Sequence, residues 1–270
     1  MYLRTAHAET DIPSLYTFIK SNPLGIFTTA IPSESSNTIQ SSHIPFILDI
    51  PDHPSSETSV LSTAAATLRG HIARANPQCK TLIAAALANT NTNTNNHGSI
   101  EDEVMVLFNG PVHHYVTPKF YVETKPSTGK VVPTWNYSAV QVYGRLRVYH
   151  DTSSPETDAF LTKQIDDLSL QSEREIFGFD GKEGRKGPWS VSESPESYVQ
   201  LLKKAIVGLE IEVTSLGGKW KMSQELKEGD RMGVVEGFEA LGTDEGTEIA
   251  RTVREREAIM NEKKMIEENS

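Results

Sequence analysis

The segment Ala139-Val140-Gln141-Val142-Tyr143-Gly144-Arg145-Leu146-Arg147-Val148-Tyr149 decides the fold class of this chain. Its apolar and polar side chains alternate, which is typical of a strand that buries one face of an antiparallel sheet. The stretch Leu209-Glu210-Ile211-Glu212-Val213-Thr214 shows the same alternation. The sequence therefore predicts an antiparallel sheet that contains both segments.

Further strands are predicted from short runs rich in β-branched and aromatic residues. Pro45 lies inside one of these runs and has no N–H to donate to a neighbouring strand, so we expect that strand at a sheet edge or a bulge. Asn109-Gly110-Pro111 predicts a turn between two apolar strands. The additional strands are expected at residues 24–31, 43–49, 68–73, 104–108 and 112–117.

Helices are predicted where a capping residue precedes an apolar stripe. Ser154-Pro155-Glu156 and Ser194-Pro195-Glu196 each offer a serine cap, a proline at the first position and a glutamate in the first turn. The second helix is expected to end at Gly208. Its single apolar stripe would consist of Tyr198, Leu201, Leu202, Ala205 and Ile206. Other helices are expected at residues 11–19, at 77–87 and from 230 onward.

Short strands with helices outside them indicate a mainly β protein with peripheral helices (α+β), an antiparallel barrel with helical decoration. The absence of GxGxxG and GxxxxGK[ST] motifs disfavours a Rossmann domain and a P-loop NTPase. We expect one domain over residues 1–242, with a disordered polar insertion at 89–98. Residues 243–270 are expected to be a charged tail, either a solvated or frayed helix or disordered, with a partner-binding helix as the alternative.

Composition restricts the partners and the compartment. The chain has 270 residues and a formal net charge of −10, so bulk affinity for nucleic acid or an anionic membrane is disfavoured. Cys79 is the single cysteine, which excludes a disulfide framework and sites that need two thiolates. No apolar run is long enough to span a bilayer, and no secretory signal is recognisable at the start. We therefore expect a cytoplasmic protein.

Three polar blocks lie within otherwise strand-forming sequence. They span residues 68–77, 129–137 and 217–224 and supply cations, hydroxyls, amides and Trp or Tyr rings. Arg and Lys pair with phosphate, amides and hydroxyls hydrogen-bond to ring heteroatoms, and aromatic faces stack. The blocks are therefore suited to a planar, phosphorylated aromatic ligand, and the alternative is that they are turn and rim residues that serve the fold.

These blocks, together with Tyr2-Leu3 and Val207-Gly208-Leu209-Glu210-Ile211, resemble the PaiB-type family of FMN-binding negative transcriptional regulators. The resemblance runs in order from residue 1 to about 240. It implies an FMN-binding split β-barrel like that of pyridoxamine-phosphate oxidases, in which two chains form a homodimer and the flavin lies in the groove between them. The chain departs from the family at 119–121, where Lys-Phe-Tyr replaces a Ser-Trp-Tyr-like run, which puts substrate access in doubt. The segments 31–42, 89–98 and beyond 242 look like insertions.

Within the matching blocks we select candidate cofactor-binding residues. Arg69 and Lys130 are the first choices for the phosphate, with ordinary salt bridges as the alternative. His71 and His43 would donate to the phosphate or the flavin edge, or else be ordinary strand histidines. Asn76 is a further candidate from the first block.

The second and third blocks supply the groups expected around the flavin ring. Thr134 and Asn136 would hydrogen-bond its polar edge and Trp135 would pack beside it; alternatively Trp135 is core and Asn136 caps a turn. Lys219 and Lys221 alternate with Trp220 on a strand and so point away from it. Either the lysines or Trp220 therefore face the ligand, and we expect both lysines near the flavin and Trp220 in the core.

No metal site is predicted, because the neighbours His113 and His114 would point to opposite faces of a strand. Cys79 is expected to be a packed or idle thiol. The function hypothesis is a flavin-dependent oxidoreductase or flavin reductase-like enzyme acting on a small molecule, with no catalytic residue assigned. The alternatives are a regulator that responds to a small ligand, with direct DNA binding disfavoured by charge, and a barrel reused for haem or another chemistry.

Overall fold

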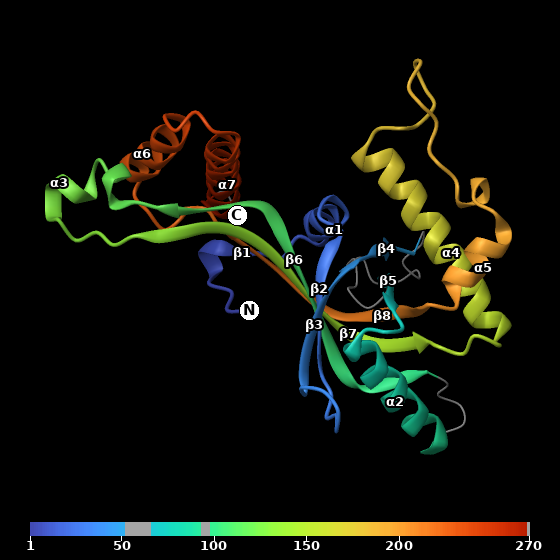
Figure 1. Cartoon of the computed structure of the whole chain (residues 1–270). Helices are drawn as coiled ribbons and strands as arrows, with labels where there is room; N and C mark the ends of the chain where they lie inside the picture. The colour runs from blue at the N-terminus through green and yellow to red at the C-terminus, as the bar shows by residue number, and fades with distance from the viewer. Residues whose placement is uncertain (52–65, 93–97, 269–270) are drawn as a thin grey trace. The chain divides into compact units, whose positions relative to one another are not determined.

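The computed structural model describes residues 1–51, 66–92 and 98–268 (Figure 1). The chain divides into two compact units. Unit 1 comprises Met1–Phe18, Asn109–Gln141 and Gly217–Ser270, and unit 2 comprises Ile19–Phe108 and Val142–Leu216. Three long strands contribute residues to both units: β6 (Ser99–Val116), β7 (Thr134–Tyr149) and β8 (Ile206–Lys221).

The sheet has the strand order β3-β2-β6-β7-β8-β5-β4, and β1 (Ala8–Glu9) pairs with β8 off this path. The other strands are β2 (Leu24–Ala30), β3 (Ile39–Pro45), β4 (Ile47–Asp49) and β5 (Thr67–Ala73). The β2–β3, β2–β6, β4–β5, β5–β8 and β1–β8 pairs are antiparallel. Pro45 is the last residue of the edge strand β3, as its missing N–H predicts. The mainly β fold class with peripheral helices is confirmed.

The helices flank the strands. Unit 2 contains α2 (Pro77–Thr92), α4 (Pro155–Gln171) and α5 (Glu196–Lys203). Unit 1 contains α3 (Thr124–Thr128), α6 (Glu228–Glu239) and α7 (Asp244–Glu268), while α1 (Ile12–Ser21) has residues in both. None of the described helices is long and apolar enough to cross a membrane.

The core of unit 2 is built around a phenylalanine cluster. Phe46 packs edge-to-face against Phe27, with ring centroids 6.4 Å apart, and against Phe108, at 6.1 Å. All three rings are buried, as are Leu68 on β5 and Leu209 on β8. The apolar faces of the predicted strands therefore form this core.

The turn expected at Asn109-Gly110-Pro111 is wrong, because β6 continues through it. β2 pairs only with residues 105–107 of β6, so Pro111 lies beyond that pairing and costs no hydrogen bond to β2. On the other side, a Cβ on Gly110 would lie 2.1 Å from Oγ of Ser138 on β7. Gly110 therefore permits a close approach of two strands, which sequence alone does not distinguish from a turn.

The helix expected after Ser194 is also wrong in its C-terminal end. Helix α5 stops at Lys203, and Gly208 lies within β8, where a Cβ would come 2.5 Å from the ring of Phe160. Tyr198 and Leu201 remain 54% and 65% exposed. The glycine therefore accommodates an aromatic ring and does not terminate a helix.

The last helix is present as α7, but the expectation of a solvated helix is wrong for its first half. Ile249, Ala250 and Val253 are fully buried or nearly so, and α7 packs against α6. In the predicted insertion, Asn89–Thr92 belong to α2, so disorder is wrong for those residues. Residues 93–97 of the insertion, and most of the loop expected at 51–62, lie outside the described part of the chain.

Cys79 on α2 is fully buried, and burial raises the pKa of its thiol to about 11. Because the thiolate is the nucleophile, the folded protein should resist alkylation at pH 8. We expect iodoacetamide to modify Cys79 only as fast as the protein unfolds, so that labelling followed by mass spectrometry accelerates when urea is added. Rapid labelling in buffer alone would contradict this expectation.

Candidate cofactor site

The candidate residues chosen from the sequence fall into both structural units. His43, Arg69, His71 and Asn76 lie in unit 2. Lys130, Thr134, Trp135, Asn136, Lys219 and Lys221 lie in unit 1.

Arg69 forms the salt bridges that were the alternative to phosphate binding. Its Nη2 donates to Asp49 Oδ1 at 3.0 Å and to Asp167 Oδ2 at 2.8 Å, and its Nε donates to the second oxygen of Asp49. Nη1 donates to Oε1 of Gln164 at 3.3 Å. The residue is only 5% exposed. All three nitrogens of the guanidinium therefore already have acceptors inside unit 2.

The other candidates in unit 2 are Asn76, His43 and His71, and they differ in burial and in hydrogen bonding. Asn76 caps α2, because its Oδ1 accepts from the backbone N–H of Gln78 at 2.9 Å. His43 is exposed on the edge strand β3. His71 shares the α4-covered face of β5 with Arg69, and burial lowers its pKa, so that its ring is neutral at pH 7. Its Nδ1 is buried without a hydrogen-bond partner among the described residues.

A groove of about 550 Å³ lies on β6 and β7 of unit 1. This volume falls within the range typical of small-molecule sites. The groove is lined by Asn109, Gly110, Pro111, His113, Trp135, Tyr137 and Ser138. Both strands contribute, so the groove exists only because β6 runs on past Pro111 beside β7.

Trp135 is an exposed aromatic group of this groove. It is 53% exposed, which rules out the alternative that it belongs to the core. Its ring lies 6.0 Å from His113 and 6.2 Å from Tyr115, measured between centroids. The indole therefore belongs to a small aromatic cluster and still offers surface to a planar ligand.

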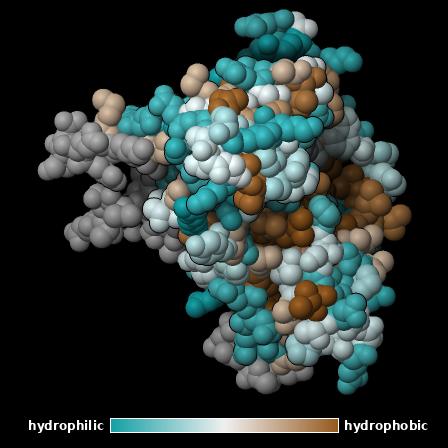
Figure 2. Space-filling model, turned by 90° about the vertical axis from the view of Figure 1, so that its left-hand side faces the viewer, coloured by the Kyte–Doolittle hydropathy of each residue, from teal (hydrophilic) through white to brown (hydrophobic). Residues whose placement is uncertain are grey.

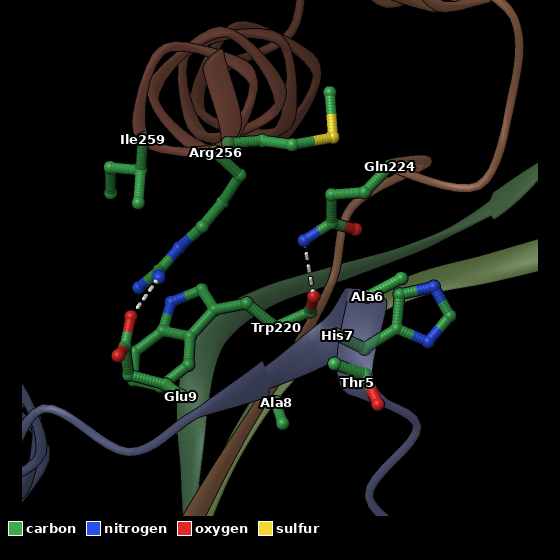
Figure 3. Close-up of a pocket in the computed structure, with 10 residues that line it drawn as sticks. Thr5, Ala6, His7, Ala8, Glu9, Trp220, Gln224, Arg256 and Ile259 are labelled. Carbon is green, nitrogen blue, oxygen red and sulfur yellow. Dashed lines mark hydrogen bonds and ion pairs between the residues drawn. The ribbon is translucent and has the colours of Figure 1, made fainter. Parts of the chain in front are cut away.

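The alternation of residues 219–221 places Trp220 in the core, as predicted. It is 7% exposed and packs edge-to-face against Phe18, with ring centroids 4.9 Å apart. The guanidinium carbon of Arg256 lies over the indole, 4.0 Å from its ring centroid (Figure 3). Arg256 in turn donates to Glu9 at 2.6 Å. Trp220 is thus held by groups that no motif in the sequence indicates.

The two lysines that flank Trp220 have different surroundings. Lys221 Nζ donates to Thr134 Oγ1, to the carbonyl oxygen of Trp135 at 3.1 Å, and pairs with Glu225 at 3.3 Å. Lys219 Nζ lies 5.4 Å from the ring centroid of Tyr137, a groove residue, and has no carboxylate within ion-pair distance among the described residues. No carboxylate of the described residues therefore neutralises Lys219, which lies beside the groove.

The remaining unit 1 candidates are Asn136 and Lys130. Asn136 is fully buried and exchanges hydrogen bonds of 3.1 and 3.2 Å with the hydroxyl of Ser223, so its amide supports the fold. Lys130 is exposed in the loop before β7, directly after Gly129 in a left-handed conformation. Lys130 remains a candidate for the phosphate, whereas Asn136 has no free side-chain surface.

Sequence reasoning missed a second, smaller cavity of about 190 Å³ in unit 1 (Figure 3). His7, Glu9, Trp220, Gln224 and Arg256 are among its lining residues. His7 is 5% exposed, and its Nε2 lies 2.9 Å from Glu225 Oε2. A lone histidine near the start of a chain carries no sequence signal, and the only hint of Glu225 is that it follows the third polar block.

Apolar side chains also reach the surface of unit 1. Val132 is 73% and Val122 57% exposed. Figure 2 shows hydrophobic residues lying at the surface between hydrophilic ones. In the loop that leads into β7, Val132 therefore adds an exposed apolar side chain close in sequence to Trp135.

The sequence of this chain is similar to those of known proteins. Residues 1–215 match a family model described as "Putative FMN-binding domain". An uncharacterized protein of Aspergillus fumigatus is 56% identical over 263 residues, covering 97% of this chain and all of that one. The protease synthase and sporulation protein PAI 2 of Bacillus subtilis is 25% identical over 236 residues, covering 87% and 88% of the two chains. FMN, the cofactor expected from the sequence, is the ligand in the family description.

A solved structure of a conserved hypothetical protein from Mycobacterium tuberculosis is also similar. It aligns with a TM-score of 0.44 at 10% identity and covers 84% of this chain and 95% of that one. The flavocytochrome Anf3 from Azotobacter vinelandii aligns with a TM-score of 0.40 at 9% identity, covering 82% and 72%.

Proposed function

The chain belongs to the FMN-binding domain family, and from this premise we propose that it binds FMN in the β6–β7 groove of unit 1 and uses it in an oxidoreductase reaction on a small molecule. The observation that carries the proposal is that one groove has both a half-exposed indole, Trp135, and beside its Tyr137 a cation, Lys219, that has no carboxylate partner among the described residues. These are the two kinds of group that an aromatic ring and a phosphate require.

The residues of the groove fit the cofactor. Trp135 offers a flat apolar surface to the isoalloxazine ring, and Tyr137 offers a phenol from the next outward position of the same strand. Lys219, next to Tyr137, would pair with the phosphate, with Lys130 as a second cation on the loop. Bound FMN supplies the redox chemistry, whereas the chain binds the cofactor, orients its ring and sets the local charge.

A second copy of the chain completes the proposed site. Cofactor sites bury most of their ligand, but Trp135 is 53% and Val132 73% exposed in one chain. A homodimer that covers this surface would enclose the flavin and exclude water from it. We expect the FMN-loaded protein to sediment as a dimer in analytical ultracentrifugation.

The test is an absorbance spectrum of the purified protein followed by titration with FMN. We expect bound flavin, and we expect Trp135→Ala to weaken FMN binding by roughly tenfold, because base–aromatic stacking is worth about 1–3 kcal/mol per ring. Trp189→Ala is the matched control, since Trp189 is also exposed, at 42%, but lies in unit 2. A colourless protein without saturable FMN binding would overturn the proposal, and a Soret band would indicate haem in its place.

A ligand-responsive regulator is the second candidate, and the similarity to the Bacillus subtilis sporulation protein favours it. The net charge of −10 argues against tight contact with duplex DNA. In this case FMN or a small ligand would change the interaction with a protein partner. A salt-sensitive mobility shift of duplex DNA near physiological ionic strength would favour a DNA-binding regulator over the enzyme.

A further inference from the structure

We propose that Lys221 is a positioning residue that holds Trp135 in place, and that Glu225 and His7 hold Lys221 in turn. The inference rests on the proposed function in one respect, namely that Trp135 contacts the flavin. It assigns different roles to two lysines that the sequence pattern treats alike.

The first step concerns the partners of the Lys221 ammonium. An ammonium group has three N–H donors. Lys221 Nζ donates hydrogen bonds to Thr134 Oγ1 and to the Trp135 carbonyl oxygen at 3.1 Å, and it forms an ion pair with Glu225 Oε1 at 3.3 Å. Its side chain is only 18% exposed. Its charge is paired with Glu225 and two of its N–H groups donate within unit 1, so Lys221 acts on the groove through the residues it holds.

The second step is where those acceptors lie. Thr134 and Trp135 are the first two residues of β7, and the preceding residues 129–133 belong to no helix or strand. The end of a strand frays unless other groups hold it. By binding one atom of each residue, the ammonium fixes the backbone from which the half-exposed Trp135 ring projects.

The third step is the support behind Lys221. The Glu225 carboxylate bridges two groups, since Oε1 faces Lys221 and Oε2 lies 2.9 Å from His7 Nε2. Burial by itself would raise the pKa of Glu225, but a backbone hydrogen bond, His7 and Lys221 outweigh it and lower that pKa. Glu225 is therefore ionised at neutral pH and attracts the ammonium. His7, in the wall of the small cavity of Figure 3, fixes the other end of the carboxylate.

The contrast with Lys219 makes the inference testable. Lys219 is proposed to meet the phosphate, so its loss should matter for FMN and not for riboflavin, which has no phosphate. Lys221 is proposed to act through the ring-binding indole, so its loss should affect both flavins equally. A direct phosphate contact by Lys221 would instead spare riboflavin.

The experiment compares Lys221→Met with wild-type protein in two measurements. In an amide–nitrogen NMR spectrum of the flavin-free protein, the indole N–H signal of Trp135, assigned with Trp135→Phe, is expected to shift or broaden. In titrations, the Kd for FMN and the Kd for riboflavin are expected to rise by the same factor, about three- to tenfold. Glu225→Gln, which keeps the shape of the side chain, is expected to move both readouts in the same direction and by less.

The matched control is Lys227→Met, because Lys227 also pairs with a glutamate of unit 1, Glu123, at 3.0 Å, and it has no ion pair with a groove residue among those that the structure describes. It should leave the indole signal and both Kd values unchanged. The inference is overturned if the Trp135 signal stays unmoved in folded Lys221→Met and Glu225→Gln, or if Lys221→Met weakens only FMN. If wild-type protein binds no flavin while the signal moves as expected, the positioning role holds and the proposed cofactor site fails.

Discussion

Replacing Arg69 by methionine is expected to lower the free energy of unfolding by about 3 kcal/mol and to leave the affinity for FMN unchanged. The guanidinium is buried and holds Asp49, Asp167 and Gln164, so its removal breaks the link between β4, β5 and α4. The expected loss is at the lower end for a broken buried ion pair, because the side chains of Asp49 and Asp167 are 44% and 36% exposed and can be solvated.

The pH dependence of this loss has a definite sign. Burial alone would raise the pKa of Asp167, but its hydrogen bonds with Lys163 and Arg69 outweigh it, and the pKa lies below its ordinary value of 3.8. A lowered carboxyl pKa stabilises the fold above the ordinary value, and that contribution disappears as the pH falls through the lowered pKa. The difference between wild type and Arg69→Met should therefore be largest near pH 7 and shrink below about pH 4.

Urea unfolding at several pH values, combined with FMN titration, measures both parts of this prediction. Arg147→Met is a suitable control, since Arg147 pairs with Glu156 at 2.8 Å on a more exposed part of the same unit and should cost much less stability. A variant of Arg69 that unfolds like wild type but has lost FMN would show instead that this arginine meets the phosphate.

Replacing Lys219 by methionine is expected to weaken FMN binding about tenfold or more and to leave riboflavin binding unchanged. A charge-assisted hydrogen bond is worth about 1.5–3 kcal/mol, and Lys219 lies beside the groove without a carboxylate partner among the described residues. The substitution keeps most of the aliphatic stem, so packing against Tyr137 and Tyr2 should persist.

Fluorescence titration with both flavins measures the effect, and the loss for FMN should decrease as salt is added. Lys125→Met serves as the control, because Lys125 is an exposed lysine of the same unit on helix α3. An equal loss for FMN and riboflavin would mean that Lys219 supports the ring and not the phosphate. If Lys219→Met leaves the binding of both flavins unchanged, Lys130 becomes the residue expected to bind the phosphate.

Much of the fold was predictable because it follows from local patterns. The alternation in 139–149 and 209–214 led to β7 and β8, and the serine and proline before residue 156 marked the start of α4. Glycine and proline led to wrong predictions of a turn and of a helix end, because their role at these positions depends on residues that are distant in the sequence. Gly110 faces Ser138 and Gly208 faces Phe160, and neither partner is close in sequence.

The candidate site was predictable in part. The sequence located the polar blocks. It also correctly placed Trp220 on the face of the strand opposite to Lys219 and Lys221, because alternation along a strand is a local property. It did not distinguish side chains that are available to a ligand from side chains whose polar atoms already bind other residues of the protein. Arg69 and Asn136 carry the right chemistry for a flavin, yet their partners Asp167 and Ser223 are far away in the chain.

By itself, the sequence determined the family, the antiparallel strands and the kinds of side chain offered to a cofactor, since each of these is carried by residue type and short-range spacing. Only the tertiary structure decided that, within the described part of the chain, Lys219 has no carboxylate partner while Lys221 pairs with Glu225, and that Trp135 lies exposed beside His113. The physical reason is that the charge and the accessibility of a side chain depend on its neighbours in space, and folding brings those neighbours from distant parts of the chain.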